Sequence, residues 1–247
     1  MSLIRRRKRL LFILLLLLCL GAIVIVINRR LFVRSVISVS QRLRGRATVA
    51  DRLEQFGEAV HGRMQPYFDA AGIPYPPARL VLVGLKTEKV LRVYAAAEGS
   101  EPKLVREYPI LAASGGPGPK LREGDLQVPE GIYGIEYLNP NSMFHLSMAV
   151  SYPNDFDKAR AREEDRRNPG GDIMIHGSDQ SIGCLAMGDE AAEDLFVLVA
   201  ETGVDKVKVV LAPNDLRFSP PPDVEAQRDW LPDLYDQLRR ELNALSE

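Results

Sequence analysis

Between residues 79 and 212 the chain is divided into short segments rich in β-branched and other apolar residues. Turn-forming residues separate these segments, which is the pattern of strands joined by tight loops. The segments are residues 79–85, 89–97, 103–113, 131–137, 142–150, 172–176 and 206–212. Because few helical segments interrupt them, we expect a mainly β fold, built as a sandwich or a barrel.

Amphipathic helices are expected to flank this β-rich region. Thr48 and Asp51 have the spacing of a capping box, and apolar residues then recur at helical spacing, which predicts a helix over residues 48–71 that is disturbed near Pro66. Beyond the proline-rich linker at residues 219–222, a C-terminal helix presents one apolar stripe. The members of that stripe are Leu231, Leu234, Tyr235, Leu238, Leu242 and Leu245.

The N-terminal region predicts a membrane anchor. Residues 5–9 are all basic and residues 10–27 carry no charge, so that a helix over the uncharged run would span roughly 27 Å, about the hydrocarbon thickness of a bilayer. A cleaved signal peptide is the alternative, but no small-residue cleavage motif follows the run. The preceding basic residues orient the N-terminus towards the cytoplasm. We therefore expect a single-pass inner-membrane protein whose remainder, from about residue 28, is periplasmic.

The net charge of −1 conceals an asymmetry along the chain. Residues 1–46 contain eleven basic residues and no acidic one, which leaves 21 basic and 33 acidic residues in the remainder. A body with such an acidic excess repels the phosphate backbone, so no nucleic-acid partner is expected.

Cys184 is the only cysteine outside the N-terminal apolar segment, and it follows His176 by eight residues. In an oxidising compartment a lone cysteine has no intrachain partner for a disulfide. One interpretation is a small buried apolar side chain. The other is a nucleophile, because a thiol and an imidazole brought together by a short loop are the minimum equipment for acyl transfer.

The local sequence favours the nucleophile. His176 stands at the end of a predicted strand, and Gly177 allows a sharp turn. Cys184 then lies in the loop before a helix predicted over residues 190–202, which Asp189 is expected to cap and Gly203 to end. Such a loop can direct the amides of Gly183 and Cys184 at a developing oxyanion.

A third group should orient the imidazole of His176. The carbonyl of Gly177, Ser178 and His145 are the candidates, and the residues alone do not choose among them.

Two other patterns are interpreted as structural. Residues 114–120 contain several glycines but lack phosphate-loop spacing, and their prolines remove amide donors, so a surface loop bordering the site is expected. His61 is interpreted as a packing or solvated histidine on the first helix. No group of residues has the spacing of zinc ligands, so we expect neither a metal nor a cofactor.

His176, Ser181, Gly183 and Cys184 resemble the pattern of the L,D-transpeptidases, whose YkuD-type catalytic domain carries a histidine followed by Ser/Thr-x-Gly-Cys. The resemblance extends to residues 128–133, which are similar to a strand entry of that family, and to residues 144–147 and 152–154, which are similar to its next strand and lip. It covers roughly residues 79–212.

Several positions depart from the family pattern. Only four residues separate His176 from Ser181, and Ile182 stands where a second histidine is common. Ala186 occupies a position where many relatives carry an arginine that meets a substrate carboxylate. These features resemble the YafK-like subgroup, some of whose members are linked to cleavage of the bond between peptidoglycan and its attached lipoprotein.

The resemblance implies a transpeptidase acting on diaminopimelate-containing peptidoglycan stems. It implies Cys184 as nucleophile and His176 as general base and acid. Support of the oxyanion is assigned to Gly183, Ser181 and Gly177, and substrate binding to His145, Tyr152, Asn154 and Ser178. A hydrolase that releases lipoprotein from peptidoglycan with the same residues is the first alternative, and an inactive wall-binding scaffold is the second.

The expected organisation has five parts. They are a cytoplasmic tail (1–9), a transmembrane anchor (10–27), a juxtamembrane linker with an amphipathic helix (28–77), a catalytic domain (78–213) and a proline-rich linker with the C-terminal helix (214–247).

Overall fold

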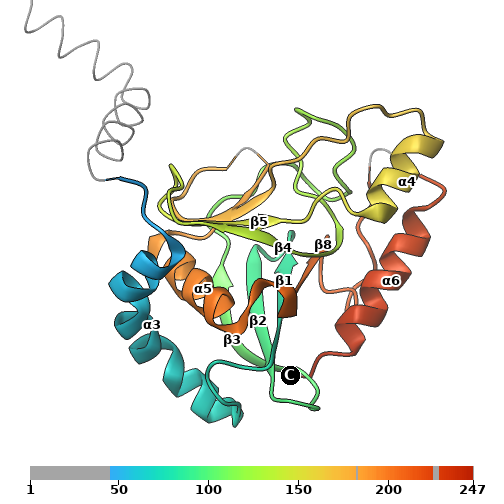
Figure 1. Ribbon diagram of the computed structural model, residues 1–247. Coiled ribbons are helices and arrows are strands. Elements are labelled where there is room, and N and C mark those ends of the chain that lie inside the picture. Colours follow the sequence, from blue (N-terminus) through green and yellow to red (C-terminus); the bar gives the residue numbers. More distant parts are fainter. Residues whose placement is uncertain (1–44, 182, 225–227, 247) are drawn as a thin grey trace, which may run out of the picture. The chain divides into compact units, whose positions relative to one another are not determined.

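Eight strands join into one sheet in the computed structural model, which describes residues 45–181, 183–224 and 228–246. Their order is β3-β2-β1-β8-β4-β5-β6-β7 (Figure 1). The strands are β1 (Arg79–Leu85), β2 (Val90–Ala96), β3 (Lys103–Pro109), β4 (Gly131–Asn139), β5 (Ser147–Val150), β6 (Met174–His176), β7 (Leu185–Ala186) and β8 (Val207–Ala212). The prediction of a mainly β fold is confirmed for this part of the chain.

The sheet is a half-barrel rather than a sandwich. Strand β4 pairs with β8 through residues 131–134 and with β5 from Ile135 onward, and its register shifts between Ile135 and Tyr137. A bulge of this kind bends a strand and lets a sheet curl. The chain leaving β3 also reaches β7, where Ala112 bridges Ala186. The strands therefore form one curved sheet, which agrees with the barrel rather than with the sandwich of the two expected arrangements.

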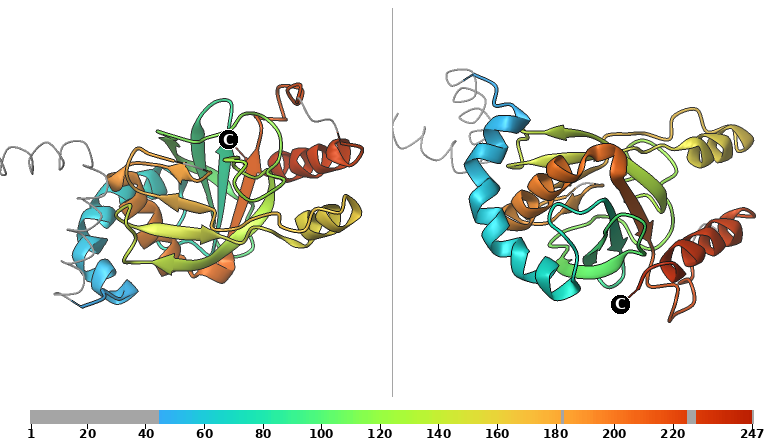
Figure 2. Two further views of the ribbon diagram at one scale, coloured as in Figure 1. Left: turned by 90° about the horizontal axis from the view of Figure 1, so that it is seen from above. Right: turned by 60° about the horizontal axis from the view of Figure 1, so that its bottom comes forward.

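Alternating side chains divide the sheet into two buried faces. Leu80 and Leu82 of β1 pack in a core with helices α3 (Val49–Ala71) and α5 (Asp189–Thr202). Val81 and Val83 point the other way, into a core with helix α6 (Leu231–Asn243). Figure 2 shows α3 and α5 on one side of the sheet and α6 on the other. The period-2 apolar pattern of the strands thus requires helices on both faces.

The amphipathic helices are confirmed. Thr48 and Asp51 form the predicted capping box of α3, which continues through Pro66 to Gly72. Five residues of the C-terminal apolar stripe are buried within α6, and Leu245 lies just beyond its end. The predicted transmembrane segment 10–27 lies outside the described residues. Within residues 45–246, no described helix has the length and apolarity needed to cross a bilayer.

We did not predict helix α4 (Asp155–Glu163) or strand β7 from the sequence. Helix α4 follows Asn154, which forms a capping box with Asp157. Strand β7 has only two residues, too few for a periodicity to be visible. The strand expected over residues 142–150 is also shorter, because the chain turns at His145 with a positive φ of 69° and β5 begins only at Ser147.

A buried ion pair joins β1, the loop before β4 and α6. The Lys86 ammonium lies 3.0 Å from the Glu130 carboxylate, which is fully buried and also accepts hydrogen bonds from the Tyr235 hydroxyl and the Gly118 amide. Burial lowers the pKa of Lys86, and the Glu130 carboxylate opposes that shift. Lys86 therefore depends on Glu130 to remain charged inside the protein.

We expect Glu130→Ala to lower the free energy of unfolding by about 3–5 kcal/mol, because it leaves a buried ammonium unpaired. Chemical denaturation of the full-length chain measures the change. The matched control is Asp236→Ala, which removes the carboxylate of an exposed pair with Arg239 and should change the free energy by less than about 0.5 kcal/mol. Equal effects of the two substitutions would contradict the structural role assigned to Glu130.

Candidate active site

Strands β6 and β7 lie next to the two candidate catalytic residues. These strands pair in parallel, with Ile175 opposite Leu185 and His176 opposite Ala186. Because side chains alternate along a strand, His176 and Ala186 share one face of the sheet. Cys184 lies in the bend that directly precedes β7. Strand β5 flanks β6 on its other side, where Ser147 pairs with His176.

The His176 imidazole is buried and held by its neighbour in the chain. Nδ1 lies 2.6 Å from the carbonyl oxygen of Gly177. A carbonyl only accepts, so Nδ1 carries the proton and Nε2 of the neutral ring is the basic nitrogen. The Phe144 ring packs against the imidazole with 4.8 Å between centroids. Burial lowers the pKa of His176, which keeps the ring neutral, although the bond to Gly177 opposes that shift.

The Cys184 sulfur rests against the main chain that leads into β6. The Met174 amide donates to Sγ at 3.4 Å, and the thiol lies 3.5 Å from the carbonyl of Asp172. Burial raises the pKa of the Cys184 thiol, against the effect of the Met174 amide. Among the described contacts, the sulfur touches these main-chain groups rather than the His176 ring. The thiol and the imidazole are thus both uncharged in this structure at neutral pH.

Ser181 closes the loop that carries the nucleophile. Its hydroxyl accepts a hydrogen bond from the Cys184 amide at 2.9 Å and donates one to the Cys184 carbonyl. The Cys184 amide, expected to face an oxyanion, is therefore engaged by Ser181 here. Gly183 adopts a φ of 111°, which L side chains rarely adopt, so the turn requires glycine. Ile182 lies outside the described residues.

Gly177 is packed too closely for any other residue. A Cβ there would lie 2.7 Å from an Asp189 carboxylate oxygen and 2.8 Å from the Phe144 carbonyl. The same Asp189 oxygen accepts from the Ser178 amide at 2.8 Å. The expected role of Asp189 as a helix cap is therefore wrong, because α5 begins at Asp189 itself after Gly188, with no side-chain cap.

The residues expected to bind substrate have partners within the fold. Asn154 caps α4 and donates from its amide group to the Ile132 carbonyl. Tyr152 is buried, and its hydroxyl donates to the Pro169 carbonyl at 2.9 Å. His145 is half-buried beside Glu193, 2.9 Å away. Ser178 borders the site through its amide. Their role in substrate binding stays a prediction.

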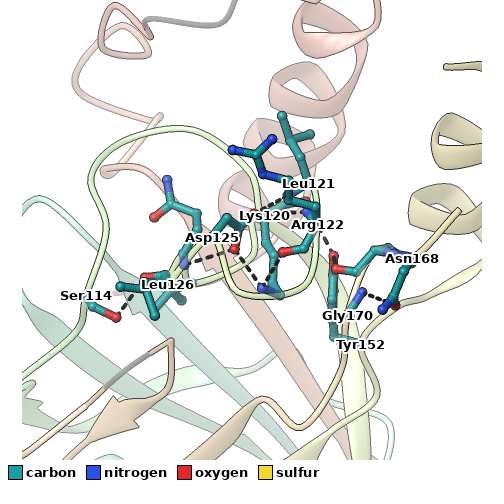
Figure 3. A network of polar contacts seen from close by, with 12 residues as sticks. Ser114, Lys120, Leu121, Arg122, Asp125, Leu126, Tyr152, Asn168 and Gly170 are labelled. Atoms are coloured by element: carbon teal, nitrogen blue, oxygen red, sulfur yellow. Dashed lines mark hydrogen bonds and ion pairs between the residues drawn. The ribbon is translucent and has the colours of Figure 1, made fainter. Parts of the chain in front are cut away.

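A polar network that sequence reasoning missed fixes the loop over residues 114–127. The Asp125 carboxylate accepts from the amides of Leu121, Arg122 and Gln127 and pairs with Lys120 at 2.7 Å. Figure 3 shows this network between Ser114 and the segment at Gly170. A Cβ at Gly183 would lie 3.7 Å from the Gln127 carbonyl. Residues 126 and 127 of the loop therefore border the nucleophile, whereas the expectation that residues 114–120 border the site stays a prediction.

Residues 78–210 match the family model of the YkuD L,D-transpeptidase catalytic domain. This match covers more than half of the chain, so the chain belongs to the L,D-transpeptidase family, whose members act on the peptide stems of peptidoglycan. Among individual proteins, YafK of Escherichia coli K12, named as an L,D-transpeptidase, is 36% identical over 116 residues. Those residues make up 46% of this chain and 44% of YafK, so the chain spans under half the length of the curated relative it matches.

Two solved structures show a partial similarity to the chain. The helical cell shape determining protein Pgp2 from Campylobacter jejuni is 27% identical, with a TM-score of 0.46 over 66% of this chain and 56% of Pgp2. L,D-transpeptidase 1 from Mycobacterium tuberculosis is 14% identical, with a TM-score of 0.32 over 54% of this chain and 62% of that protein.

We expect Gly177→Ala to lower the free energy of unfolding by about 1–3 kcal/mol, because the added methyl group meets a main-chain carbonyl and a carboxylate. Chemical denaturation of the full-length chain is the measurement. Gly116→Ala is the matched control, since a Cβ at Gly116 meets nothing within 4 Å. An unchanged free energy of unfolding in Gly177→Ala would show that the turn at Phe144 moves to accept the methyl group and does not constrain the site.

Proposed function

We propose that this chain is a cysteine L,D-transpeptidase acting on diaminopimelate-containing stem peptides of peptidoglycan. Family membership supports the reaction class. The observation that carries the proposal is the bond from His176 Nδ1 to the Gly177 carbonyl, which leaves Nε2 as the basic nitrogen on β6, the strand that pairs with β7 directly after Cys184. In this proposal Cys184 is the nucleophile, His176 the base and the Gly177 carbonyl the group that orients the base.

In the first step the Cys184 sulfur turns from the Met174 amide towards Nε2 of His176 and gives up its proton. The thiolate attacks the carbonyl carbon at the L-centre of diaminopimelate. The bond from that carbon to the next amine breaks, and the proton held by His176 passes to the leaving nitrogen. A thioester to Cys184 and a free amine are the products.

In the second step an acceptor amine attacks the thioester. His176 takes a proton from the attacking nitrogen and returns it to the departing Cys184 sulfur. A new amide links two stems, and the thiol is restored. Water in place of the amine gives hydrolysis by the same proton transfers.

Main-chain amides supply the positive potential that this chemistry needs. The Met174 amide donates to the sulfur in the resting site, and this bond is released when the sulfur turns towards His176. The Gly183 amide stands beside the nucleophile and is the remaining candidate donor to the oxyanion. The Cys184 amide can join it only if its bond to Ser181 is released.

The hydrolase alternative rests on a single feature. Ala186 is buried opposite His176, where many relatives carry an arginine for a substrate carboxylate. Without that arginine the stem is held differently, and release of attached lipoprotein becomes the competing outcome. The inactive scaffold is disfavoured, because both Cys184 and His176 are present.

The proposed location follows from the chain before α3. The uncharged run at residues 10–27, after five basic residues, anchors the protein in the inner membrane with its N-terminus in the cytoplasm. The catalytic part then faces the periplasm, where peptidoglycan is found. Protease accessibility in spheroplasts tests the orientation, because degradation of the catalytic part only after membrane lysis would contradict it.

We expect the full-length chain to change the mass of diaminopimelate-containing muropeptides, and Cys184→Ala to leave them unchanged. Incubation with and without an added amine acceptor, followed by mass spectrometry, separates cross-linking from hydrolysis. Muropeptides carrying a lipoprotein peptide test the hydrolase alternative in the same assay. Unchanged substrates in every arm would contradict both enzymatic functions.

The pKa directions predict a slow, alkaline alkylation of the resting thiol. The pKa of Cys184 is raised above its ordinary value of about 8.5, so the thiolate fraction at neutral pH is smaller than that of a free cysteine. We expect the rate of iodoacetamide alkylation to keep rising above about pH 8.5. Peptide-level mass spectrometry distinguishes Cys184 from Cys19, and a rate that levels off below pH 7 would instead indicate a preformed thiolate–imidazolium pair.

A further inference from the structure

We propose that His145 is a positioning residue for His176, and that helix α3 holds His145 in place together with Glu193 of α5. This inference rests on the proposed function of His176 as the base. It assigns to α3, which the sequence places outside the catalytic domain, a part in the chemistry of the site.

The turn at residues 144–145 supports the catalytic histidine from two directions. The Phe144 ring packs on the His176 imidazole, and the Phe144 carbonyl and the His145 Cβ lie within about 3 Å of where a Cβ on Gly177 would stand. Gly177 provides the carbonyl that holds Nδ1. A shift of this turn therefore moves both the ring that covers the imidazole and the carbonyl that orients it.

The turn at residues 144–145 has an unfavourable backbone conformation, which side-chain contacts stabilise. His145 has a φ of 69°, in the left-handed region that costs a residue with a Cβ roughly 1–2 kcal/mol. Its Nε2 lies 2.9 Å from a Glu193 carboxylate oxygen, and the Phe56 ring of α3 meets its ring edge-on at 5.4 Å between centroids. Side chains from two helices, α3 and α5, thus contact the His145 imidazole.

Glu193 is itself fixed by α3. Arg63 lies 3.2 Å from the Glu193 carboxylate and 2.7 Å from that of Asp194. Asp194 is fully buried and also binds Arg106 of β3 and the Tyr108 hydroxyl. Because a buried carboxylate with several charged partners has one geometry, α3 and α5 have a fixed relation beside His145. The groups that face the His145 ring from these helices are Glu193 and, through it, Arg63.

A second imidazole–carboxylate pair between the same helices provides a matched control. His61 of α3 lies 2.9 Å from Glu201 of α5. Residues 193 and 201 are eight apart, so Glu201 lies about 12 Å further along α5 at the rise of a helix. Loss of this pair weakens the same helix–helix contact without touching the turn at His145.

The experiment measures how fast a carbapenem acylates the full-length chain. The family resemblance suggests that carbapenems acylate Cys184. The increase in intact-protein mass gives the rate. Variants are Glu193→Gln, Glu201→Gln and His176→Ala, and the double variant Glu193→Gln with His176→Ala. We expect Glu193→Gln to slow acylation about 10- to 100-fold, since small displacements of a base have large effects on rate. Glu201→Gln should leave the rate within about twofold of the unchanged chain.

The double variant separates positioning from a general structural role. If Glu193 acts through His176, Glu193→Gln has no further effect once His176 is alanine. The same loss in both backgrounds, or an equal loss in Glu201→Gln, overturns the inference. If His176→Ala alone acylates at the unchanged rate, the proposed function of His176 fails instead.

Substitutions at His145 give an independent test of the turn. Asparagine tolerates the left-handed region better than alanine does. We expect His145→Asn to retain more of the acylation rate than His145→Ala, provided circular dichroism shows both to be folded. A greater loss in His145→Asn than in His145→Ala would count against a role of the backbone turn.

Discussion

The close approach of the chain at Gly177 to the turn at Phe144 is the constraint on which the site depends. A main-chain carbonyl, rather than a carboxylate, orients the imidazole of His176. The direction of the Gly177 carbonyl is set by packing against Phe144 and Asp189, which leaves no room for a Cβ on Gly177. One steric condition therefore selects the tautomer of the ring, places its basic nitrogen and fixes the end of strand β6, so the geometry of the base needs no separate acidic residue.

Burial acts on the two candidate catalytic groups in opposite directions. It raises the pKa of the Cys184 thiol and lowers that of the His176 imidazole, and both shifts favour the uncharged forms. A thiolate–imidazolium pair is therefore disfavoured before substrate binds. A resting thiol of this kind resists oxidation better than a thiolate does, which agrees with the oxidising compartment that we propose for this part of the chain. In the proposed reaction, the Cys184 thiol must therefore lose its proton when substrate binds.

Local patterns in the sequence predict the strands and helix α3, because alternation and capping residues are properties of neighbouring residues. The pairing of Cys184 with His176 stays a prediction. Features that arise between distant segments were missed. The contact of His145 with Glu193 joins residues 48 apart in sequence, and no local signal indicates it. Helix α4 is the exception, since the spacing of Asn154 and Asp157 carries its capping signal, but Asn154 was interpreted as part of a substrate lip.

Under the proposed function, the choice between an amine and water as acceptor does not lie in Cys184 and His176, because both proposed reactions use these residues in the same way. It must lie in what surrounds the thioester. On one side stands the loop over residues 114–127, which Asp125 holds through main-chain amides and an ion pair with buried Lys120. A wall fixed in this way excludes water only if it keeps its shape when substrate binds. For the proposed reaction, we therefore expect this loop to influence which acceptor reaches the thioester.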